Sequence, residues 1–371
     1  MTTLALEAEA ARRFQAFLAS LPSASATRIH VLCDSDCDGL PAGALLVRAL
    51  GLAGYPHVTI EPKRKGESAW SPEVIERLKA RNPEALFVLD LGSRADALLP
   101  GVPTLLIDHH LPGGTPPGSE LITGYGTEPT PTTGLLVYWC LRVLIAEEQR
   151  KALLWLAALS ILSDLGDKAP FAELAEARTL WPTGPMRDAV SLLNAPRRTA
   201  NADATEALQT LLIAVNPKQI SKGELPQSTA LLAAKEEVAV ALAAAKKAAP
   251  KFSRKYRETL GADLVALRMD TPCQVHPLVA QTWRGRFRDS IVMGVNFGFR
   301  PGYVHFSARG PKGVNVIQFL RAHAPAGADQ GYGNGHDQAS GGAVPVASWN
   351  AFAEDLGFGP ELQLASPDPA A

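Results

Sequence analysis

Histidine and aspartate residues stand at the ends of three short apolar segments in the first third of the chain. These motifs are His30-x3-Asp34-x-Asp36, a single Asp90, and Asp108-His109-His110. Imidazole and carboxylate groups favour Mn2+ or Mg2+, with Zn2+ or iron as alternatives, whereas a structural zinc site would be rich in cysteine. No cysteine occupies a matching position, so the residue types point to a metal centre that takes oxygen and nitrogen ligands.

The candidate metal ligands, taken together, are His30, Asp34, Asp36, Asp90, His109 and Asp164. Six ligands are too many for one catalytic ion that keeps open positions, but they suit two. Two divalent ions about 3.5–4 Å apart can hold both the attacking and the leaving oxygen of a phosphoryl displacement, and a water between them becomes a nucleophile at neutral pH. Asp90 lies between the flanking motifs and is the expected bridging carboxylate. Any one of these aspartates alone would more often be a turn or cap residue.

Alternating strands and helices are expected to position these residues. Apolar β-rich runs at 28–33, 85–89 and 103–107 alternate with helical patterns at 39–50 and 71–80. Ser71 and Pro72 are a suitable cap and first position for the second helix. This order predicts an α/β fold whose parallel sheet carries helices on both faces. Ligands of such sheets gather at the carboxyl ends of the strands, where the aspartates and histidines stand.

The remainder of the chain suggests a second domain. A loop rich in Gly, Pro and Thr is expected at 111–131, followed by helices at 132–145 and 151–163, and short β-like runs return from Leu264. The segment 202–249, rich in Ala, Leu, Lys and Glu, is expected to connect two domains, although it could equally be a helical part of the first. The expected domains are 1–200 for catalysis and metal binding, 201–250 as a helical connector, 251–360 for substrate binding, and a tail at 361–371.

Features of the C-terminal half suit a phosphate-bearing substrate. Residues 246–312 contain thirteen Lys or Arg against four Asp or Glu, although an ordinary solvated surface is the alternative explanation. Backbone N–H groups of the glycine-rich run 331–342 can receive phosphate oxygens together with His336. Arg309, two residues after Ser307, can add a bidentate contact. Each of these features is weak alone, because glycines mark turns and arginines are common on surfaces.

Composition limits the class of protein. The chain has 371 residues and a formal net charge of -1, so no overall basic field indicates a polyanion partner. Its N-terminus has the pattern of an amphipathic helix, and the longest apolar run, 152–162, is shorter than the ~20 residues that span a bilayer. Four cysteines in a chain of this length do not form a disulfide framework. A soluble cytoplasmic protein without membrane contact is expected.

The ordered motifs resemble those of the DHH phosphoesterase family with its associated C-terminal domain, which includes RecJ-like exonucleases and nano-RNases. The resemblance covers nearly the whole chain. Its N-terminal motifs are His30-Val-Leu-Cys-Asp34-Ser-Asp36-Cys-Asp38-Gly39, Leu89-Asp90, Asp108-His109-His110 and Ser163-Asp164-Leu165. The C-terminal signature is Gly335-His336-Asp-Gln-Ala339-Ser-Gly341, preceded by Ser307-Ala-Arg309. Four ordered motifs together with this signature are far more specific than the triplet that gives the family its name.

The resemblance implies a role for each motif. One ion, expected to be Mn2+ with Mg2+ as the alternative, would be held by His30, Asp34 and Asp90. The second would be held by Asp36, Asp90, His109 and Asp164, while Asp38 is not expected to be a direct ligand. His110 would face the scissile phosphate, which makes the expected catalytic group Asp36, Asp90, His109 and His110. The C-terminal domain would close over the cleft and bind the nucleic-acid end through Ser307, Arg309, Gly335, His336 and Gly341.

Within the family, the first motif and the segment Ser163-Asp-Leu-Gly-Asp167 resemble RecJ-like single-strand exonucleases. The expected function is release of mononucleotides from single-stranded DNA or RNA, with a repair or replication protein as a candidate partner. Small substrates are the alternative: short oligoribonucleotides, a cyclic dinucleotide, or 3′-phosphoadenosine 5′-phosphate. A catalytically inactive binding subunit is a third hypothesis, against which the intact motifs argue. The chain ends soon after the glycine signature, so a further nucleic-acid-binding domain is expected to be missing, and Asn334 stands where glycine is common.

Overall fold

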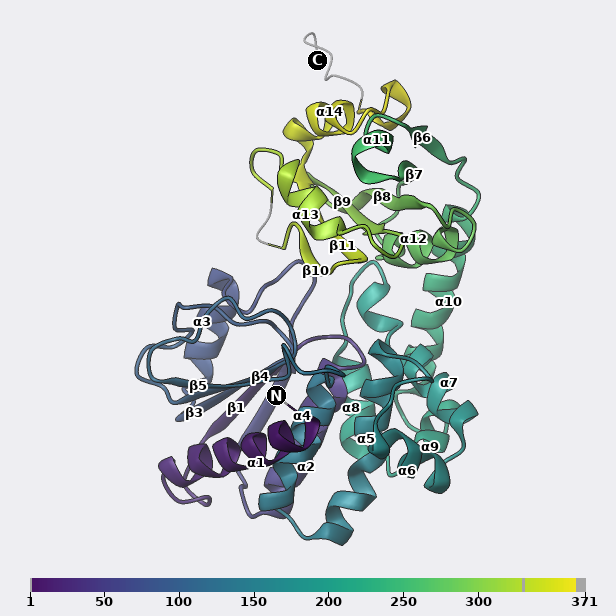
Figure 1. Ribbon diagram of the computed structural model, residues 1–371. Coiled ribbons are helices and arrows are strands. Elements are labelled where there is room, and N and C mark those ends of the chain that lie inside the picture. The colour runs from purple at the N-terminus through teal and green to yellow at the C-terminus, as the bar shows by residue number, and fades with distance from the viewer. Residues whose placement is uncertain (1, 329–330, 365–371) are drawn as a thin grey trace. The chain divides into compact units, whose positions relative to one another are not determined.

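The computed structural model describes residues 2–328 and 331–364, except for the side chain of His336 (Figure 1). The chain forms two compact units. The N-terminal unit comprises Met1–Arg197 and Ala202–Lys235, and the C-terminal unit comprises Arg198–Asn201 and the chain from Glu236 onwards. The change from one unit to the other thus falls inside the segment expected as a connector, and the functional division into domains stays a prediction.

The N-terminal unit is built on a five-stranded parallel sheet with the order β2-β1-β3-β4-β5. Its strands are β1 (Ile29–Cys33), β2 (Val58–Pro62), β3 (Ala85–Leu89), β4 (Thr104–Asp108) and β5 (Ser119–Thr123). The three central strands are buried along their whole length, as parallel strands covered on both faces must be. The expected parallel sheet is confirmed. The strand β5 was missed, because its short sequence lies in a segment whose glycines and prolines predicted only a loop.

Alternate side chains of the central strands enter two separate cores. Val31, Phe87 and Ile107 pack with four helices: α1 (Thr3–Ser20), α2 (Gly39–Leu52), α4 (Thr133–Cys140) and α5 (Glu147–Asp164). Their neighbours Leu32, Val88 and Leu106 pack with α3 (Pro72–Arg81) on the other face. Figure 1 shows α1 and α2 on one side of the sheet and α3 on the other. Helices on both faces are therefore confirmed.

Several expected helix ends differ from the observed ones. The helix expected at 132–145 ends earlier, because α4 gives way to a 3-10 turn, Leu141–Val143. Ser71 precedes α3, but its hydroxyl accepts the N–H of Ser68 and makes no cap bond. The remaining helices of this half are α6 (Ala172–Leu180), α7 (Thr183–Leu193), α8 (Thr205–Ile213) and α9 (Pro217–Ser221), and α10 (Ser228–Ala245) runs across the boundary between the units.

The C-terminal unit has a mixed six-stranded sheet with the order β10-β11-β9-β8-β7-β6. Its strands are β6 (Lys251–Ser253), β7 (Asp263–Met269), β8 (Ser290–Arg300), β9 (Tyr303–Arg309), β10 (Asn334–His336) and β11 (Ala339–Pro345). The helices are α11 (Arg257–Leu260), α12 (His276–Arg284), α13 (Val316–Ala322) and α14 (Val346–Asp355). Only β7 and β8 pair in parallel, with α12 as the connection between them. A second, smaller α/β unit is thus confirmed.

The glycine-rich run 331–342 is not the loop that its composition predicted. Most of it forms the antiparallel pair β10 and β11, which extends the sheet next to β9. A Cβ on Gly341 would lie 2.4 Å from the carbonyl oxygen of Phe306, and one on Gly342 would lie 2.6 Å from the ring of Tyr332. These glycines are therefore required for close packing of the strands.

Among the described residues, no helix combines the length and the apolar character that crossing a bilayer requires.

Candidate metal centre

The carboxyl ends of three neighbouring strands bring most of the predicted site residues together. Asp34 directly follows β1, Asp90 directly follows β3, and Asp108 is the last residue of β4. The backbone N–H of Asp34 donates to Leu89 (3.0 Å), and the N–H of Asp90 donates to Ile107 (3.1 Å), so the sheet register fixes these residues side by side. Asp90 has a φ of 64°, which is unfavourable for a residue with a Cβ and is tolerated where the surroundings determine the conformation.

His109 lies at the centre of this cluster with its imidazole 4% exposed. Its Nε2 lies 3.5 Å from an oxygen of Asp90, 3.6 Å from one of Asp164 and 3.7 Å from one of Asp38. These distances are too long for hydrogen bonds, and Nε2 has no hydrogen-bond partner among the described residues. They leave room for a cation that sits about 2 Å from each ligand. A buried nitrogen without a partner among three carboxylates therefore fits a divalent metal ion.

Two overlapping groups can hold an ion. One consists of Asp90, His109 and His110, and the other of Asp38, His109 and Asp164, with the ligand atoms of each group within 4.8 Å of one another. Both groups contain His109. In this geometry the residue common to the two groups is His109, and Asp90 belongs to one of them.

Asp38 belongs to the cluster although it was not expected to be a ligand. Its carboxylate accepts the N–H groups of Thr133 (2.9 Å) and Gly134 (2.7 Å) at the start of α4 and the hydroxyl of Ser160 (2.5 Å). A Cβ on Gly134 would come within 2.5 Å of that hydroxyl, so a larger residue there would displace Ser160 and its bond to Asp38. Asp38 is fully buried, and these donors engage both of its carboxylate oxygens, of which Oδ2 also faces His109.

Burial of several carboxylates in one place has an electrostatic cost. The pKa of Asp90 is raised well above its usual value by burial and by the charges of Asp38 and Asp36. Burial and the same two neighbours raise the pKa of Asp164, and burial raises that of Asp38. A cation bound among these groups would favour their ionised forms. Binding of a divalent ion would therefore stabilise this cluster of carboxylates.

Asp34 and Asp36 face basic side chains that the motif search did not include. Lys63 Nζ lies 2.8 Å from Asp34, and Arg197 lies 3.7 Å from Asp36. Asp36 also accepts the N–H groups of Asp38 and Gly39, and these bonds together with Arg197 outweigh burial and lower its pKa to about 2. Lys63 directly follows β2 and so reaches the same end of the sheet, which was the signal that could have identified it.

His110 is oriented by Asp108. The Asp108 carboxylate lies 2.9 Å from His110 Nδ1 and accepts the backbone N–H groups of His110 and Gly92, both at 2.6 Å. Burial lowers the pKa of His110, but the bond to Asp108 and the nearby acidic charges outweigh it and raise the pKa to about 9. The ring is 42% exposed, so a cationic imidazole borders the metal centre and remains accessible.

The structure does not bring His30 to this cluster. His30 is the second residue of β1, whereas the cluster lies beyond the last residue, roughly 13 Å further along at 3.3 Å per residue. The His30 ring is 1% exposed, and its Nδ1 lies 2.8 Å from the hydroxyl of Thr59. The spacing His-x3-Asp did not show how far His30 lies along β1 from the carboxyl end of the strand.

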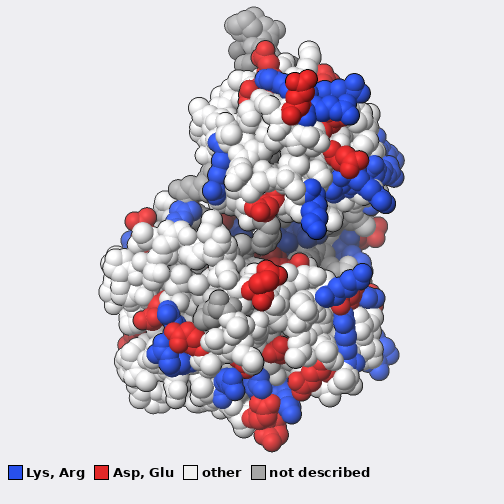
Figure 2. Space-filling view, viewed as in Figure 1, with Lys and Arg blue, Asp and Glu red and all other residues white. Residues whose placement is uncertain are grey.

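The expected substrate-binding residues lie in the C-terminal unit. Arg309 donates to the hydroxyl of Ser307 (2.7 Å) and to the carbonyl of Ala308 (2.9 Å), and Ser307 pairs with Gly341 across β9 and β11. Gly335 pairs with Ser340 in the adjoining strand. Burial lowers the pKa of Arg309. The side chain of His336 lies outside the described part of the structure. Figure 2 shows that basic side chains of this unit are mixed with acidic ones on the face in view.

Comparison with known proteins supports the resemblance that the motifs indicated. No protein-family model matches the sequence. The single-stranded-DNA-specific exonuclease RecJ of Salmonella typhimurium is 35% identical over 103 residues, which is 26% of this chain and 18% of that protein. The RecJ of Escherichia coli is 34% identical over the same length. The matched region thus covers less than a fifth of these relatives.

Solved structures extend the likeness to the whole fold. A crystal structure of RecJ from Thermus thermophilus in complex with Mn2+ has a TM-score of 0.67 at 20% identity, covering 95% of this chain and 54% of that one. A structure of an exonuclease RecJ bound to manganese has a TM-score of 0.61 at 21% identity, covering 95% and 93% of the two chains. The present chain therefore resembles DHH and RecJ proteins in sequence and in fold, as its motifs predicted.

Two substitutions distinguish the expected ligand His30 from the unexpected Asp38. We expect Mn2+ to raise the melting temperature of the unsubstituted protein, because a ligand that binds only the folded state stabilises it. His30→Asn should retain this increase, and Asp38→Asn should lose most of it. Thermal unfolding with and without Mn2+ measures the difference. The reverse pattern would place His30 among the ligands and contradict the geometry around His109.

The response to Mn2+ should also depend on pH. The pKa values of Asp90, Asp38 and Asp164 are raised in the folded protein, so the metal-free folded state binds more protons than the unfolded chain. Its stability therefore falls as the pH rises from the unfolded to the folded pKa values of these aspartates. Protons and cation compete for the same oxygens. The increase in melting temperature should therefore be larger at about pH 8 than at about pH 5. A shift independent of pH would contradict this assignment.

Proposed function

We propose that this DHH- and RecJ-like chain is a metal-dependent phosphodiesterase that hydrolyses single-stranded nucleic acid to mononucleotides. The observation that carries the proposal is the buried Nε2 of His109, which has no hydrogen-bond partner in the described structure and faces carboxylate oxygens of Asp38, Asp90 and Asp164. We propose two divalent ions there, with Mn2+ as the principal candidate because the similar RecJ structures contain manganese.

The ions would polarise the phosphoryl oxygens and make a bound water acidic enough to attack at neutral pH. The protein's own groups hold the arrangement in place. Thr133 donates its hydroxyl to Asp90 (2.9 Å) and so orients the carboxylate of the proposed bridging residue. Lys63 and Arg197 limit the negative charge of the first motif and give an anionic substrate a favourable approach.

His110 is assigned the contact with the scissile phosphate. Its Nδ1 is engaged by Asp108, and this contact raises the pKa of the ring to about 9 in the metal-free protein, which favours the cationic form. The exposed remainder of the ring can then donate a hydrogen bond to a phosphate oxygen, where negative charge increases during displacement. In this proposal Asp36, Asp90, His109 and His110 form the catalytic group.

We assign binding of the nucleic-acid end to the C-terminal unit. Ser307, Arg309 and Gly341 lie on adjacent strands, and Gly335 lies on the next. The planar guanidinium of Arg309 suits a phosphate. We place His336 in this group on its motif alone. A cytoplasmic location and a repair or replication protein as partner complete the proposal.

Strands of graded length test the proposed substrate. We expect the full chain with Mn2+ to shorten end-labelled DNA or RNA of thirty nucleotides progressively from one end. Asp90→Ala should reduce the rate roughly a hundredfold or more, because it removes the carboxylate that is proposed to hold both ions. Cleavage confined to strands of two to five nucleotides would assign a small-nucleotide substrate instead. Absence of cleavage by protein that still responds thermally to Mn2+ would contradict catalysis and favour a binding subunit.

The role of Asp108 can be separated from metal binding. Asp108→Asn removes the charge that orients and protonates His110, so we expect kcat to fall roughly 10- to 100-fold, as for other groups that position a site residue. The thermal response to Mn2+ should persist. The exposed Asp96, changed to Asn, is the matched control and should leave kcat unchanged. A loss of the Mn2+ response in Asp108→Asn would show that this residue acts on the metal centre instead.

A further inference from the structure

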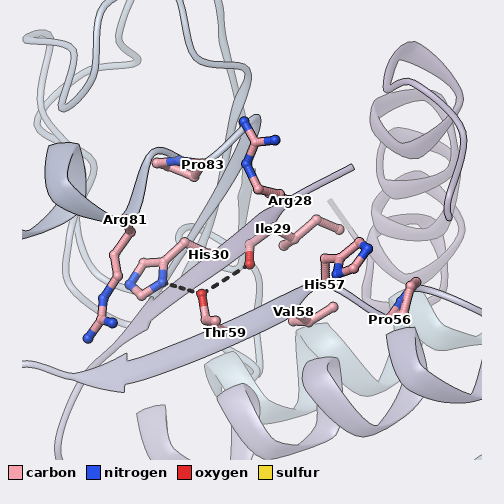
Figure 3. A pocket seen from close by; sticks show the side chains of 9 residues that line it. All are labelled: Arg28, Ile29, His30, Pro56, His57, Val58, Thr59, Arg81 and Pro83. Atoms are coloured by element: carbon pink, nitrogen blue, oxygen red, sulfur yellow. Dashed lines mark hydrogen bonds between the residues drawn. The ribbon is translucent and has the colours of Figure 1, made fainter. Parts of the chain in front are cut away.

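A separate cavity of about 320 Å3 lies in the N-terminal unit, where strands β1 and β2 begin. It is lined by Arg28, Ile29, His30, Pro56, His57, Val58, Thr59, Arg81 and Pro83 (Figure 3). The metal centre lies at the opposite ends of the same strands. No lining residue is acidic, and two are arginines, so the cavity differs in charge from the metal centre.

His30 supplies a hydrogen-bond acceptor that its surroundings do not use. The contacts of the Thr59 hydroxyl with the Ile29 carbonyl (3.3 Å) and with His30 Nδ1 (2.8 Å) are both satisfied when the hydroxyl donates to Ile29 and Nδ1 donates to the hydroxyl. We therefore assign the proton to Nδ1 and a lone pair to Nε2. Burial lowers the pKa of His30 to about 4, which keeps the ring neutral. Nε2 is buried and has no hydrogen-bond partner in the part of the chain that the structure describes.

An unused acceptor at the wall of a cavity favours a ligand that donates a hydrogen bond. In Figure 3 the Nε2 of His30 is turned away from Thr59, on the side along which the Arg81 side chain runs. Arg81 has a 54% exposed side chain, and its guanidinium lies 3.5 Å from a carboxylate oxygen of Glu61. Arg28 is more firmly held, since it bonds the Asn82 carbonyl and pairs with Glu84. Arg81 is therefore the cation that can move to meet a ligand and give access to His30.

We propose that this cavity binds a small phosphorylated molecule that carries hydroxyl groups, a sugar phosphate or a nucleoside monophosphate. Its phosphate would pair with Arg81, whose planar guanidinium can donate two hydrogen bonds to two phosphate oxygens. A hydroxyl would donate to His30 Nε2. The cavity volume is at the lower end of the range for small-molecule sites and suits a ligand of this size. The inference is independent of the proposed hydrolysis, because it uses none of the metal-centre residues.

Calorimetric titration of the full chain, without divalent cations, tests the site with three probes: ribose 5-phosphate, AMP and inorganic phosphate. Arg81→Gln should weaken binding of the first two about tenfold or more, the usual effect of losing a charge-assisted hydrogen bond. His30→Asn keeps a donor towards Thr59 but removes Nε2, so it should weaken ribose 5-phosphate and leave inorganic phosphate unchanged. Arg12→Gln alters another exposed arginine of the same unit and is the matched control.

A nitrogen-15 spectrum of the histidines gives an independent readout. We expect ribose 5-phosphate to shift the Nε2 resonance of His30, because the chemical shift of this nitrogen changes when its lone pair accepts a hydrogen bond. Tighter binding of AMP than of ribose 5-phosphate would identify a nucleotide as the ligand, and equal binding would identify the sugar phosphate. The proposal is overturned if both variants bind as the unsubstituted protein does, if inorganic phosphate binds as tightly as ribose 5-phosphate, or if no probe shifts Nε2.

Discussion

The constraint on which the N-terminal unit depends is the burial of several carboxylates around one imidazole. Asp38, Asp90 and His109 are each less than 5% exposed, yet none of the described lysines or arginines forms an ion pair with Asp38 or Asp90. Isolated buried charges are too costly to persist, so the cluster must be protonated or must bind metal. Neighbouring groups offset part of this cost. The start of α4 donates hydrogen bonds to Asp38, and His110 neutralises Asp108. Lys63 and Arg197 face Asp34 and Asp36.

The parallel sheet makes this cluster possible because it aligns the ends of strands that are distant in sequence. The strands β1, β3 and β4 each carry a site residue at the first position beyond the strand: Asp34, Asp90 and His109. The turn after β1 closes tightly, and a Cβ on Gly39 would come within 2.7 Å of the Asp34 backbone. Three aspartates two residues apart thus fit into one turn, and the third of them, Asp38, reaches furthest into the core.

The sequence predicted which strands carry the site but not how deep each residue lies. Asp90 and His109, which directly follow strands, lie near each other because strand ends meet at one edge of a parallel sheet, and Asp164 joins them from the end of α5. The positions of His30 and Asp38 relative to the cluster differ from expectation for the same physical reason. The spacing of residues in the sequence does not show where a strand ends and its turn begins. The pair β10 and β11 was missed because glycine composition does not distinguish a flexible loop from closely packed strands.

Strand β1 therefore separates two chemical environments with one short buried segment. At its carboxyl end carboxylates gather and burial raises the pKa values of Asp38 and Asp90, which suits a cation. Near its amino end His30 is neutral and the neighbouring charges include Arg28 and Arg81, which suits an anion. Val31, Leu32 and Cys33 between them are fully buried and apolar, so they keep water and ions from linking the two ends. One strand can then serve both sites because each recognises charge of the opposite sign.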